Sequence, residues 1–282
     1  MKIGIVGLGL IGGSFARAYR QYSDENCAGF EIFAYNRSRS ILDFAIMSGV
    51  VDGELNDETI PECDVIFVGL YPRSSIEYME KIAPLVNKKA IVMDLCGTKT
   101  EICRAGFALA EKYGFTFIGG HPMAGTQYSG YKYSRANMFV GAPMVIVPPK
   151  FDDIELLDRV KHILLPAGFG KFSVTTAEEH DRLIAFTSQL AHVVSNAYVK
   201  SPTARSHKGF SAGSYKDMTR VAWLNEKMWT ELFFENKDPL LFELDTIINS
   251  LTEYRDALRD GDTDKMMSLL RDGREAKESI DK

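Results

Sequence analysis

The chain has 282 residues, enough for two domains of typical size, and its 45% hydrophobic and 25% charged residues form an ordinary globular mixture that excludes a disordered or fibrous protein. Its formal net charge of −5 argues against a nucleic-acid partner, because proteins that bind nucleic acids carry a basic patch on their surface. No apolar run approaches the ~18 residues of a membrane span, so we expect no membrane partner. The four cysteines are scattered and form no CxxC pair, which fits a reducing compartment, so we expect a cytoplasmic protein.

Short β-like runs alternate with helical stretches through the first 175 residues. Strands are predicted at 2–7, 30–35, 65–70, 90–95, 116–118, 144–148 and 170–175. Helices are predicted at 12–21, 38–48 and 152–164. Strands that alternate with helices indicate βαβ units, so this half of the chain is predicted to form a doubly wound, mostly parallel sheet.

The pattern changes after Thr176, and no strand is predicted beyond it. Residues 177–200 carry apolar side chains three and four positions apart, the spacing of an amphipathic helix: Leu183, Phe186, Leu190, Val193 and Ala197. A loop at 202–213 and a helix at 216–236 follow. Asp238 is predicted as the N-cap of the next helix, with Pro239 at its first position, and Asp262 or Thr263 begins the last helix.

Large apolar residues are frequent in this helical half: Trp223, Trp229, Phe233 and Phe234. They exceed what a small helical domain needs to bury by itself, which favours a homodimer formed through these helices. Packing within the core of a single chain is the alternative, and it is the commoner reason for such residues.

A glycine motif follows the first predicted strand directly and opens the first predicted helix: Gly7-Leu8-Gly9-Leu10-Ile11-Gly12. Gly7 permits the tight turn, Gly9 lets the backbone approach a pyrophosphate, and Gly12 lets the helix pack on the strand. The pyrophosphate would lie at the positive end of the helix, where Leu10 and Ile11 carry free N–H groups. The strand and the helix together support a Rossmann dinucleotide site, and the alternative is a glycine-rich turn without a ligand.

The end of the second predicted strand distinguishes between the two nicotinamide cofactors. NAD-binding domains carry an acidic residue there, which bonds the ribose hydroxyls, whereas this chain has Asn36, Arg37 and Ser38. Because a carboxylate would repel a 2′-phosphate and an arginine can pair with it, we favour NADP. NAD stays open because Asn36 could bond a ribose hydroxyl and Arg37 could be an ordinary solvated charge.

Two further segments carry candidate catalytic groups. The run Gly-Gly-His-Pro-Met-Ala-Gly-Thr at 119–126 is predicted to be a loop at the carboxyl end of a strand, the edge where α/β sheets bind ligands. Its His121 has the side chain best able to exchange a proton near neutral pH, although a structural histidine is the alternative. Asp217 and Arg220 lie three apart on one helical face, where Arg220 could hold a carboxylate bidentately.

The polar groups of the helical half also admit structural interpretations. Asp217 and Arg220 could form a surface ion pair, or Asp217 could complete a capping box with Ser214. A polar stripe lies on the helix predicted at 177–200, and such stripes are more often solvated than catalytic. Its members are Asp181, Ser188, His192 and Ser195.

Taken in their order along the chain, these motifs resemble those of the prephenate dehydrogenase family, which also includes arogenate dehydrogenases. The matching segments cover nearly the whole chain: residues 7–14, residues 121–126, the helix around His192 and residues 217–222. The family combines a Rossmann domain with a helical dimerisation domain. The resemblance therefore implies an α/β domain at 1–175, an all-α domain at 176–282 and a homodimer formed through the second domain.

The resemblance also implies a role for each matching residue. His121 is the catalytic group that accepts a hydrogen bond, or the proton, from the ring hydroxyl of the substrate, and Arg220 holds a substrate carboxylate. The other implied site residues are His192 among the catalytic groups and Asp217, Ser188 and Thr126 among the substrate-binding groups. No metal is implied, and the sequence contains no His/Cys cluster that offers one a site.

Two stretches depart from the family pattern. The family's Asp-Val-Gly-Ser-x-Lys is Asp-Leu-Cys-Gly-Thr-Lys at 94–99 here, with Gly97 in place of the active-site serine. Thr98 is therefore the candidate for the catalytic hydroxyl, and a water is the alternative. The family's Ser-His-Leu-Pro-His is Ser-Gln-Leu-Ala-His at 188–192, so that Gln189 replaces one of two histidines.

The implied reaction is the oxidative decarboxylation of prephenate to 4-hydroxyphenylpyruvate in tyrosine biosynthesis, with hydride transfer to NADP or NAD. Arogenate dehydrogenase activity is the nearest alternative, because arogenate differs only by an amine in place of the side-chain ketone. A β-hydroxyacid dehydrogenase is more distant, because Lys200 and Lys208 lie in no motif that supports the catalytic lysine of that class. A non-catalytic nucleotide-binding regulator is least expected, because it would have no use for His121 or Arg220.

Overall fold

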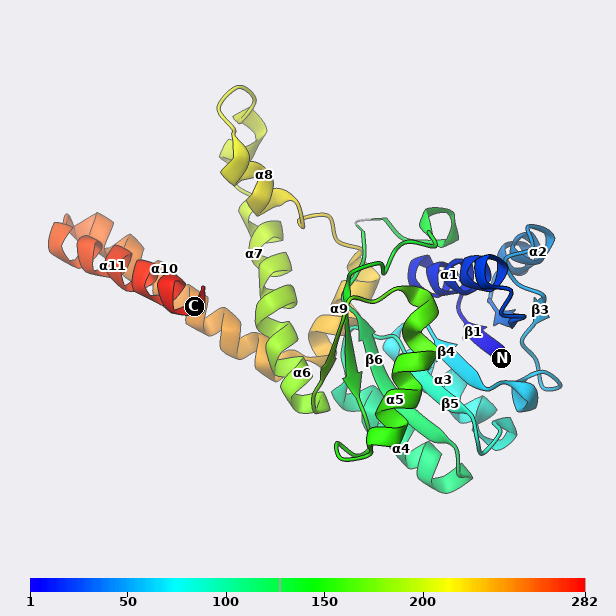
Figure 1. Cartoon of the computed structure of the whole chain (residues 1–282). Helices are drawn as coiled ribbons and strands as arrows, with labels where there is room; N and C mark the ends of the chain where they lie inside the picture. Colours follow the sequence, from blue (N-terminus) through cyan, green and yellow to red (C-terminus); the bar gives the residue numbers. More distant parts are fainter. Residues whose placement is uncertain (127, 282) are drawn as a thin grey trace.

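A computed structural model describes residues 1–126 and 128–281 of the chain (Figure 1). The first half forms one eight-stranded sheet in the order β3-β2-β1-β4-β5-β6-β7-β8. The strands are β1 (Lys2–Val6), β2 (Glu31–Tyr35), β3 (Gly53–Glu54), β4 (Val65–Val68), β5 (Ile91–Asp94), β6 (Thr116–Pro122), β7 (Pro143–Val147) and β8 (Lys171–Val174). Neighbours run parallel except for β6 and β7, which confirms the mostly parallel sheet.

Helices cover both faces of this sheet. They are α1 (Leu10–Asn26), α2 (Arg39–Met47), α3 (Pro72–Ile82), α4 (Thr100–Tyr113) and α5 (Ile154–Leu164). Because successive side chains of a strand point to opposite faces, β4 sends Phe67 into the apolar cluster under α1, α2 and α5, and Ile66 into the cluster under α3 and α4. Strands buried on both faces are continuous apolar runs, which is why composition alone located them.

The strand order reverses beside β1, which pairs with β2 on one side and with β4 on the other. In an open α/β sheet such a switch point leaves a crevice beyond the carboxyl ends of the strands, and ligands bind there. The β1–α1 turn and the segments that follow β4 and β5 therefore border the expected ligand site.

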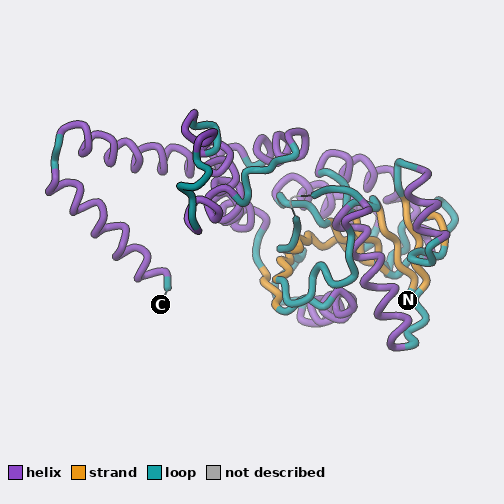
Figure 2. Tube along the Cα trace, turned by 90° about the horizontal axis from the view of Figure 1, so that it is seen from above, coloured by secondary structure: helices purple, strands orange, loops and turns teal. Residues whose placement is uncertain are grey.

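The second half is helical, and no strand follows Val174 within the described part of the chain. Its helices are α6 (Ala177–Ile184), α7 (Ala191–Tyr198), α8 (Gly213–Thr219), α9 (Glu226–Glu235), α10 (Lys237–Asp260) and α11 (Thr263–Ile280). A π-helical segment, Ala185–Leu190, joins α6 to α7. Figures 1 and 2 show α10 and α11 extending away from the sheet, and Figure 1 shows the α7–α8 arm projecting in a different direction.

Two predicted boundaries in this half are wrong. The helix expected at 216–236 is interrupted, because Asn225 caps α9 by accepting a hydrogen bond from the Met228 N–H. Asp238 is not an N-cap, because α10 already begins at Lys237. The joint between α9 and α10 is Asn236, whose buried amide donates to the Asp181 carbonyl and to Gln189 Oε1, so tertiary contacts set this boundary.

The predicted start of the last helix is confirmed. Asp262 caps α11 by accepting a hydrogen bond from the Lys265 N–H. Between residues 1 and 281, apart from the undescribed residue 127, no helix is long and apolar enough to span a bilayer. Lys282, the last residue of the predicted second domain, lies outside the described residues.

Candidate active site

The β1–α1 turn has the shape that a dinucleotide pyrophosphate requires. A Cβ atom on Gly12 would lie 2.0 Å from the Gly7 carbonyl oxygen, so only glycine allows α1 to start this close to β1. A Cβ on Gly9 would meet no atom within 4 Å, so the backbone there is open to a ligand. No side chain caps the first turn of α1, whose N–H groups, including those of Leu10 and Ile11, face the same opening. The turn therefore fits the predicted cofactor.

Asn36, which directly follows β2, stabilises this turn through hydrogen bonds. Its Oδ1 accepts a hydrogen bond of 3.0 Å from the Leu8 N–H, and its Nδ2 donates to the Ser38 carbonyl. Arg39 pairs with Asp43 and with Glu54, whereas Arg37 is exposed and forms no salt bridge with any described residue. Arg37 is thus the arginine available to an anionic ligand at this edge.

His121 lies on a strand, so the expectation of a loop at 119–126 is wrong for 119–122 and holds for 123–126. Residues Thr116–Ile118 of β6 pair with β5, and from Gly119 to Pro122 the strand pairs with β7 instead. The second partner extends the strand four residues beyond the predicted end. A Cβ on Gly120 would lie 2.6 Å from the Asp94 carbonyl oxygen, so glycine is needed where β6 crosses the end of β5.

The His121 ring belongs to a chain of polar groups that the sequence did not predict. His121 Nδ1 lies 2.9 Å from His180 Nε2, and His180 Nδ1 lies 2.7 Å from Asp181 Oδ1. His180 and Asp181 are 2% and 3% exposed, so this is a buried pair in the middle of α6. An adjacent His-Asp pair at the start of an amphipathic helix was the available signal, but nothing local shows that it faces His121.

Burial governs the protonation of these groups. It lowers the pKa of His121 well below its ordinary value, and the nearby His180 and Lys99 act in the same direction. Burial also lowers the pKa of His180, although Asp181 opposes the shift. For Asp181 burial alone would raise the pKa, but hydrogen bonds from His180 and Thr100 outweigh it and hold the pKa below its usual value. Near neutral pH both rings are neutral and the carboxyl group is ionised.

A buried ion pair supports the same site from the sheet side. Lys99 Nζ contacts Asp94 Oδ2, and both side chains are fully buried. The carboxylate of Asp94 also accepts hydrogen bonds from the backbone N–H groups of Cys96 and Gly120. Asp94 therefore ties the segment after β5 to β6, one residue before His121.

Gly97, and not Thr98, faces His121. A Cβ on Gly97 would lie 4.0 Å from His121 Nε2 and 3.5 Å from Leu232, so a side chain there would have room and would reach the ring. The Thr98 hydroxyl donates a hydrogen bond of 2.6 Å to Glu235 on α9. Burial raises the pKa of Glu235, and nearby acidic groups add to this while Thr98 opposes it. The Thr98 hydroxyl is thus engaged in joining the two halves of the chain.

The helical half carries Ser188, His192 and Arg220 among the predicted site residues. His192 Nδ1 lies 2.8 Å from the Ser188 carbonyl oxygen, and the His192 ring packs on Trp229 with 4.1 Å between centroids. Burial lowers the pKa of His192, its bond to Ser188 opposes this, and the charge of Arg220 lowers it further, so Arg220 lies near His192. No hydrogen bond joins this second group to His121 within residues 1–126 and 128–281.

Two further predicted substrate-binding residues are Asp217 and Thr126. The capping-box interpretation of Ser214 and Asp217 is wrong, because α8 begins after Ala212 with no side-chain cap. Asp217 is exposed and, among the described residues, forms no ion pair with Arg220. The Thr126 hydroxyl accepts a hydrogen bond of 3.2 Å from the Tyr128 N–H.

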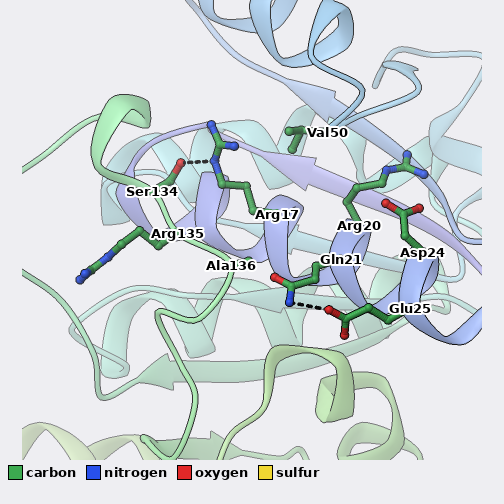
Figure 3. Close-up of a pocket in the computed structure, with 9 residues that line it drawn as sticks. All are labelled: Arg17, Arg20, Gln21, Asp24, Glu25, Val50, Ser134, Arg135 and Ala136. Atoms are coloured by element: carbon green, nitrogen blue, oxygen red, sulfur yellow. Dashed lines mark hydrogen bonds between the residues drawn. The ribbon is translucent and has the colours of Figure 1, made fainter.

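No three His, Cys, Asp or Glu side chains gather in a metal-binding arrangement within the part of the chain that the structure describes. A cavity of about 610 Å³ lies elsewhere, between α1 and the segment 134–136 (Figure 3). Arg17 in this cavity donates to the Ser134 hydroxyl, and Gln21 donates to Glu25. The residues that line this cavity do not include His121, His180 or Asp181.

Comparisons with known proteins agree with this layout. Residues 15–172 match the family model described as prephenate dehydrogenase, nucleotide-binding domain, and residues 176–272 match prephenate dehydrogenase, dimerization domain. The chain is 27% identical to the cyclohexadienyl dehydrogenase of Zymomonas mobilis, over 98% of this chain and 94% of that protein.

Two solved structures are similar over their full length. The arogenate dehydrogenase of Synechocystis has a TM-score of 0.79 and 27% identity, covering 99% of this chain and 100% of that one. The prephenate dehydrogenase of A. aeolicus, in complex with hydroxyphenyl propionate and NAD+, has a TM-score of 0.80 and 25% identity, covering 99% and 98%.

Proposed function

The chain belongs to the prephenate dehydrogenase family, and we propose that it converts prephenate to 4-hydroxyphenylpyruvate and CO2 with a nicotinamide nucleotide, as a step of tyrosine biosynthesis. The observation that carries the proposal is the His121 ring, which is bound through Nδ1 and presents Nε2 toward Gly97. The test is an assay of the purified protein with prephenate and either nucleotide. Formation of 4-hydroxyphenylpyruvate together with reduced nucleotide is expected, and the absence of both products with either nucleotide would reject the proposal.

His121 has the properties of a general base. Its lowered pKa keeps the ring neutral near pH 7, and Nε2 can accept the proton of the substrate's ring hydroxyl. His121 then returns the proton to the phenolate oxygen that decarboxylation leaves, so the residue is regenerated in each turnover. Aromatisation of the ring drives the decarboxylation. The protein's task is to orient the ring, place the base and neutralise the carboxylate that remains on the product.

The glycine turn would hold the cofactor. Gly7, Gly9 and Gly12 leave the backbone open for the pyrophosphate, next to the N–H groups of Leu10 and Ile11. When bound, the cofactor would supply the acceptor for the hydride that leaves the ring carbon carrying the hydroxyl group.

We predict that the cofactor is NADP and that Arg37 binds its 2′-phosphate, with help from Ser38. The Arg37→Ala variant should bind NADP about 10–100-fold more weakly, because a hydrogen bond to a charged group contributes about 1.5–3 kcal/mol, and its affinity for NAD should stay nearly the same. Equilibrium titration of both nucleotides measures this. Arg39→Ala is the matched control, because Arg39 is already paired with Asp43 and Glu54. Equal weakening for both nucleotides would contradict the assignment.

We predict that Arg220 binds a carboxylate of the substrate beside His192. The Arg220→Ala variant should raise KM for prephenate about 10–100-fold with a smaller effect on kcat, because the lost contact is a charge-assisted hydrogen bond. Steady-state kinetics measure both constants. Arg274→Ala on α11, an exposed arginine, is the control and should leave KM unchanged. An unchanged KM in Arg220→Ala would show that Arg220 is only a surface charge.

The pH profile of kcat/KM should report the lowered pKa of His121. A base with a lowered pKa stays deprotonated to lower pH, so the acid limb of the profile should fall below the ordinary histidine value of about 6.5. Initial rates between pH 4.5 and 9 would measure it. An acid limb centred at or above about 6.5 would contradict the proposed state of His121.

Arogenate is the second candidate substrate. One of the similar structures is an arogenate dehydrogenase, and arogenate shares with prephenate the ring hydroxyl that His121 would recognise and the carboxylates, one of which Arg220 would bind. Initial rates with prephenate and arogenate, each with NAD and NADP, would rank the four combinations. A preference for arogenate would change the assigned substrate and leave the roles of His121 and the glycine turn unchanged.

We further propose a homodimer formed through the helical half. Large apolar side chains of α10 and α11, among them Leu251, Leu258 and Leu270, are more than half exposed in the single chain. The matching family model for these residues is described as a dimerization domain.

All four cysteines are free, which supports the expectation of a reducing compartment such as the cytoplasm.

A further inference from the structure

The carboxylate of Asp181 is fixed as a hydrogen-bond acceptor at both of its oxygens. Oδ1 accepts from the backbone N–H of Lys99 at 2.7 Å, and Oδ2 accepts from the backbone N–H of Thr100 at 2.8 Å. An amide N–H can only donate, so neither oxygen needs a proton of its own. A side chain from the middle of α6 thus caps the N-terminus of α4, where a negative charge is also favoured by the helix dipole.

The acceptor at Asp181 sets the position of each proton as far as His121. His180 Nδ1 must donate to Asp181 Oδ1, and a neutral imidazole has one proton, so His180 Nε2 is an acceptor. His121 Nδ1 must then donate to His180 Nε2, which leaves the lone pair of His121 on Nε2. This is the nitrogen that lies 4.0 Å from the Cβ position of Gly97.

We propose that His180 and Asp181 are positioning residues that fix the Nδ1–H tautomer of His121 and so present its Nε2 as the base. The inference rests on the proposed function, in which His121 takes a proton from the substrate. Neither residue needs to touch the substrate, because both act through the His121 ring.

The same chain of groups stabilises the charge that His121 gains. When Nε2 takes the substrate's proton, the Nδ1 proton can move to His180 Nε2, so that one proton enters the chain and one moves along it. The positive charge then lies on His180, at 2.7 Å from the ionised Asp181. The other charged groups near the rings are Lys99 and Asp94, which pair with each other. Asp181 is therefore the unbalanced negative charge available to an imidazolium at this site.

The experiment separates orientation from proton uptake with two variants of one residue. His180→Gln places an amide oxygen near the Nε2 position, which can still accept from His121 Nδ1–H but cannot take a proton. His180→Asn places its amide near Nδ1, which can still bond Asp181 but leaves His121 Nδ1 without its acceptor. The readout is the ¹⁵N NMR spectrum of histidine-labelled protein without substrate, which distinguishes the two tautomers of each of the five histidines.

Wild-type His121 and His180 should both carry their proton on Nδ1. In His180→Asn the tautomer of His121 should shift toward Nε2–H, and kcat should fall at least about 100-fold with KM changed less, since loss of an orienting carboxylate in a serine-protease triad costs about 10⁴. His180→Gln should keep the Nδ1–H tautomer and recover part of kcat. His162→Asn is the control, because His162 also lies beside an aspartate, Asp158, but on the exposed face of α5.

An Nε2–H tautomer for His121 in the wild-type protein would overturn the inference, and this measurement needs no variant to fold. An unchanged His121 tautomer in a folded His180→Asn variant would also overturn it. Both readouts use the free protein, so they stand even where prephenate proves not to be the substrate. Failure of wild-type turnover would instead reject the proposed function.

Discussion

Replacing His121 with asparagine should lower the kcat for prephenate by about 10²–10⁴-fold, the usual contribution of a positioned general base. The asparagine amide lies near the position of the histidine Nδ1 and can still donate to His180 Nε2, so the surrounding contacts are kept. What the variant loses is the second ring nitrogen, which receives the substrate's proton. KM should therefore change much less than kcat, and steady-state kinetics with saturating nucleotide would separate the two constants.

The His162→Asn variant is again the appropriate control, because this exposed histidine of α5 lies outside the site. Its kcat should equal that of the wild-type protein. Thermal unfolding of His121→Asn should show a native transition, so that a lost activity cannot be assigned to a lost fold. A kcat for His121→Asn within about threefold of the wild-type value would remove His121 from the role of base.

Replacing Lys99 with methionine should lower the free energy of unfolding by about 3–5 kcal/mol, which is the cost of leaving one partner of a buried ion pair uncompensated. Lys99 and Asp94 have no exposed side-chain surface. Methionine fills most of the space of the lysine stem but provides no charge for the Asp94 carboxylate. Equilibrium unfolding in urea would measure the loss, which is a large part of the stability of an ordinary domain.

Two companion variants make this measurement specific. Lys265→Met removes an exposed ion pair with Glu253, and its effect should stay within about 1 kcal/mol. Lys99→Met combined with Asp94→Asn removes both charges and should recover part of the lost stability. A loss below about 1 kcal/mol in Lys99→Met alone would show that Asp94 is satisfied by the Cys96 and Gly120 N–H groups without Lys99.

The elements that local chemistry controls were predictable from the sequence. Strand β4 is a short apolar run buried on both faces, and such runs stand out in composition whatever surrounds them. The N-cap at Asp262 was predictable for the same reason, because the capping bond is made within the first turn of α11. The glycine turn also belongs here, since Gly7 and Gly12 contact each other across a few residues of chain.

The elements that depend on distant partners were not predictable. The extension of β6 to Pro122 requires β7, which runs antiparallel beside it and begins about twenty residues later. The two-residue strand β3 exists only because it pairs with β2. The start of α10 depends on Asn236, whose buried amide bonds Gln189 and the Asp181 carbonyl. In each case the deciding hydrogen bond joins residues that no local pattern relates.

The sequence by itself determined the two-part organisation, the glycine turn and the residue types of the site, because turn geometry, apolar periodicity and motif spacing act over short distances. Only the tertiary structure decided which of the polar residues meet. His180 is 59 residues from His121, and Asp181 is 82 residues from Lys99. Packing of α6 against α4 brings them within hydrogen-bond distance. The position of a proton depends on the acceptor at the far end of such a chain of groups, so it follows from packing and not from any single motif.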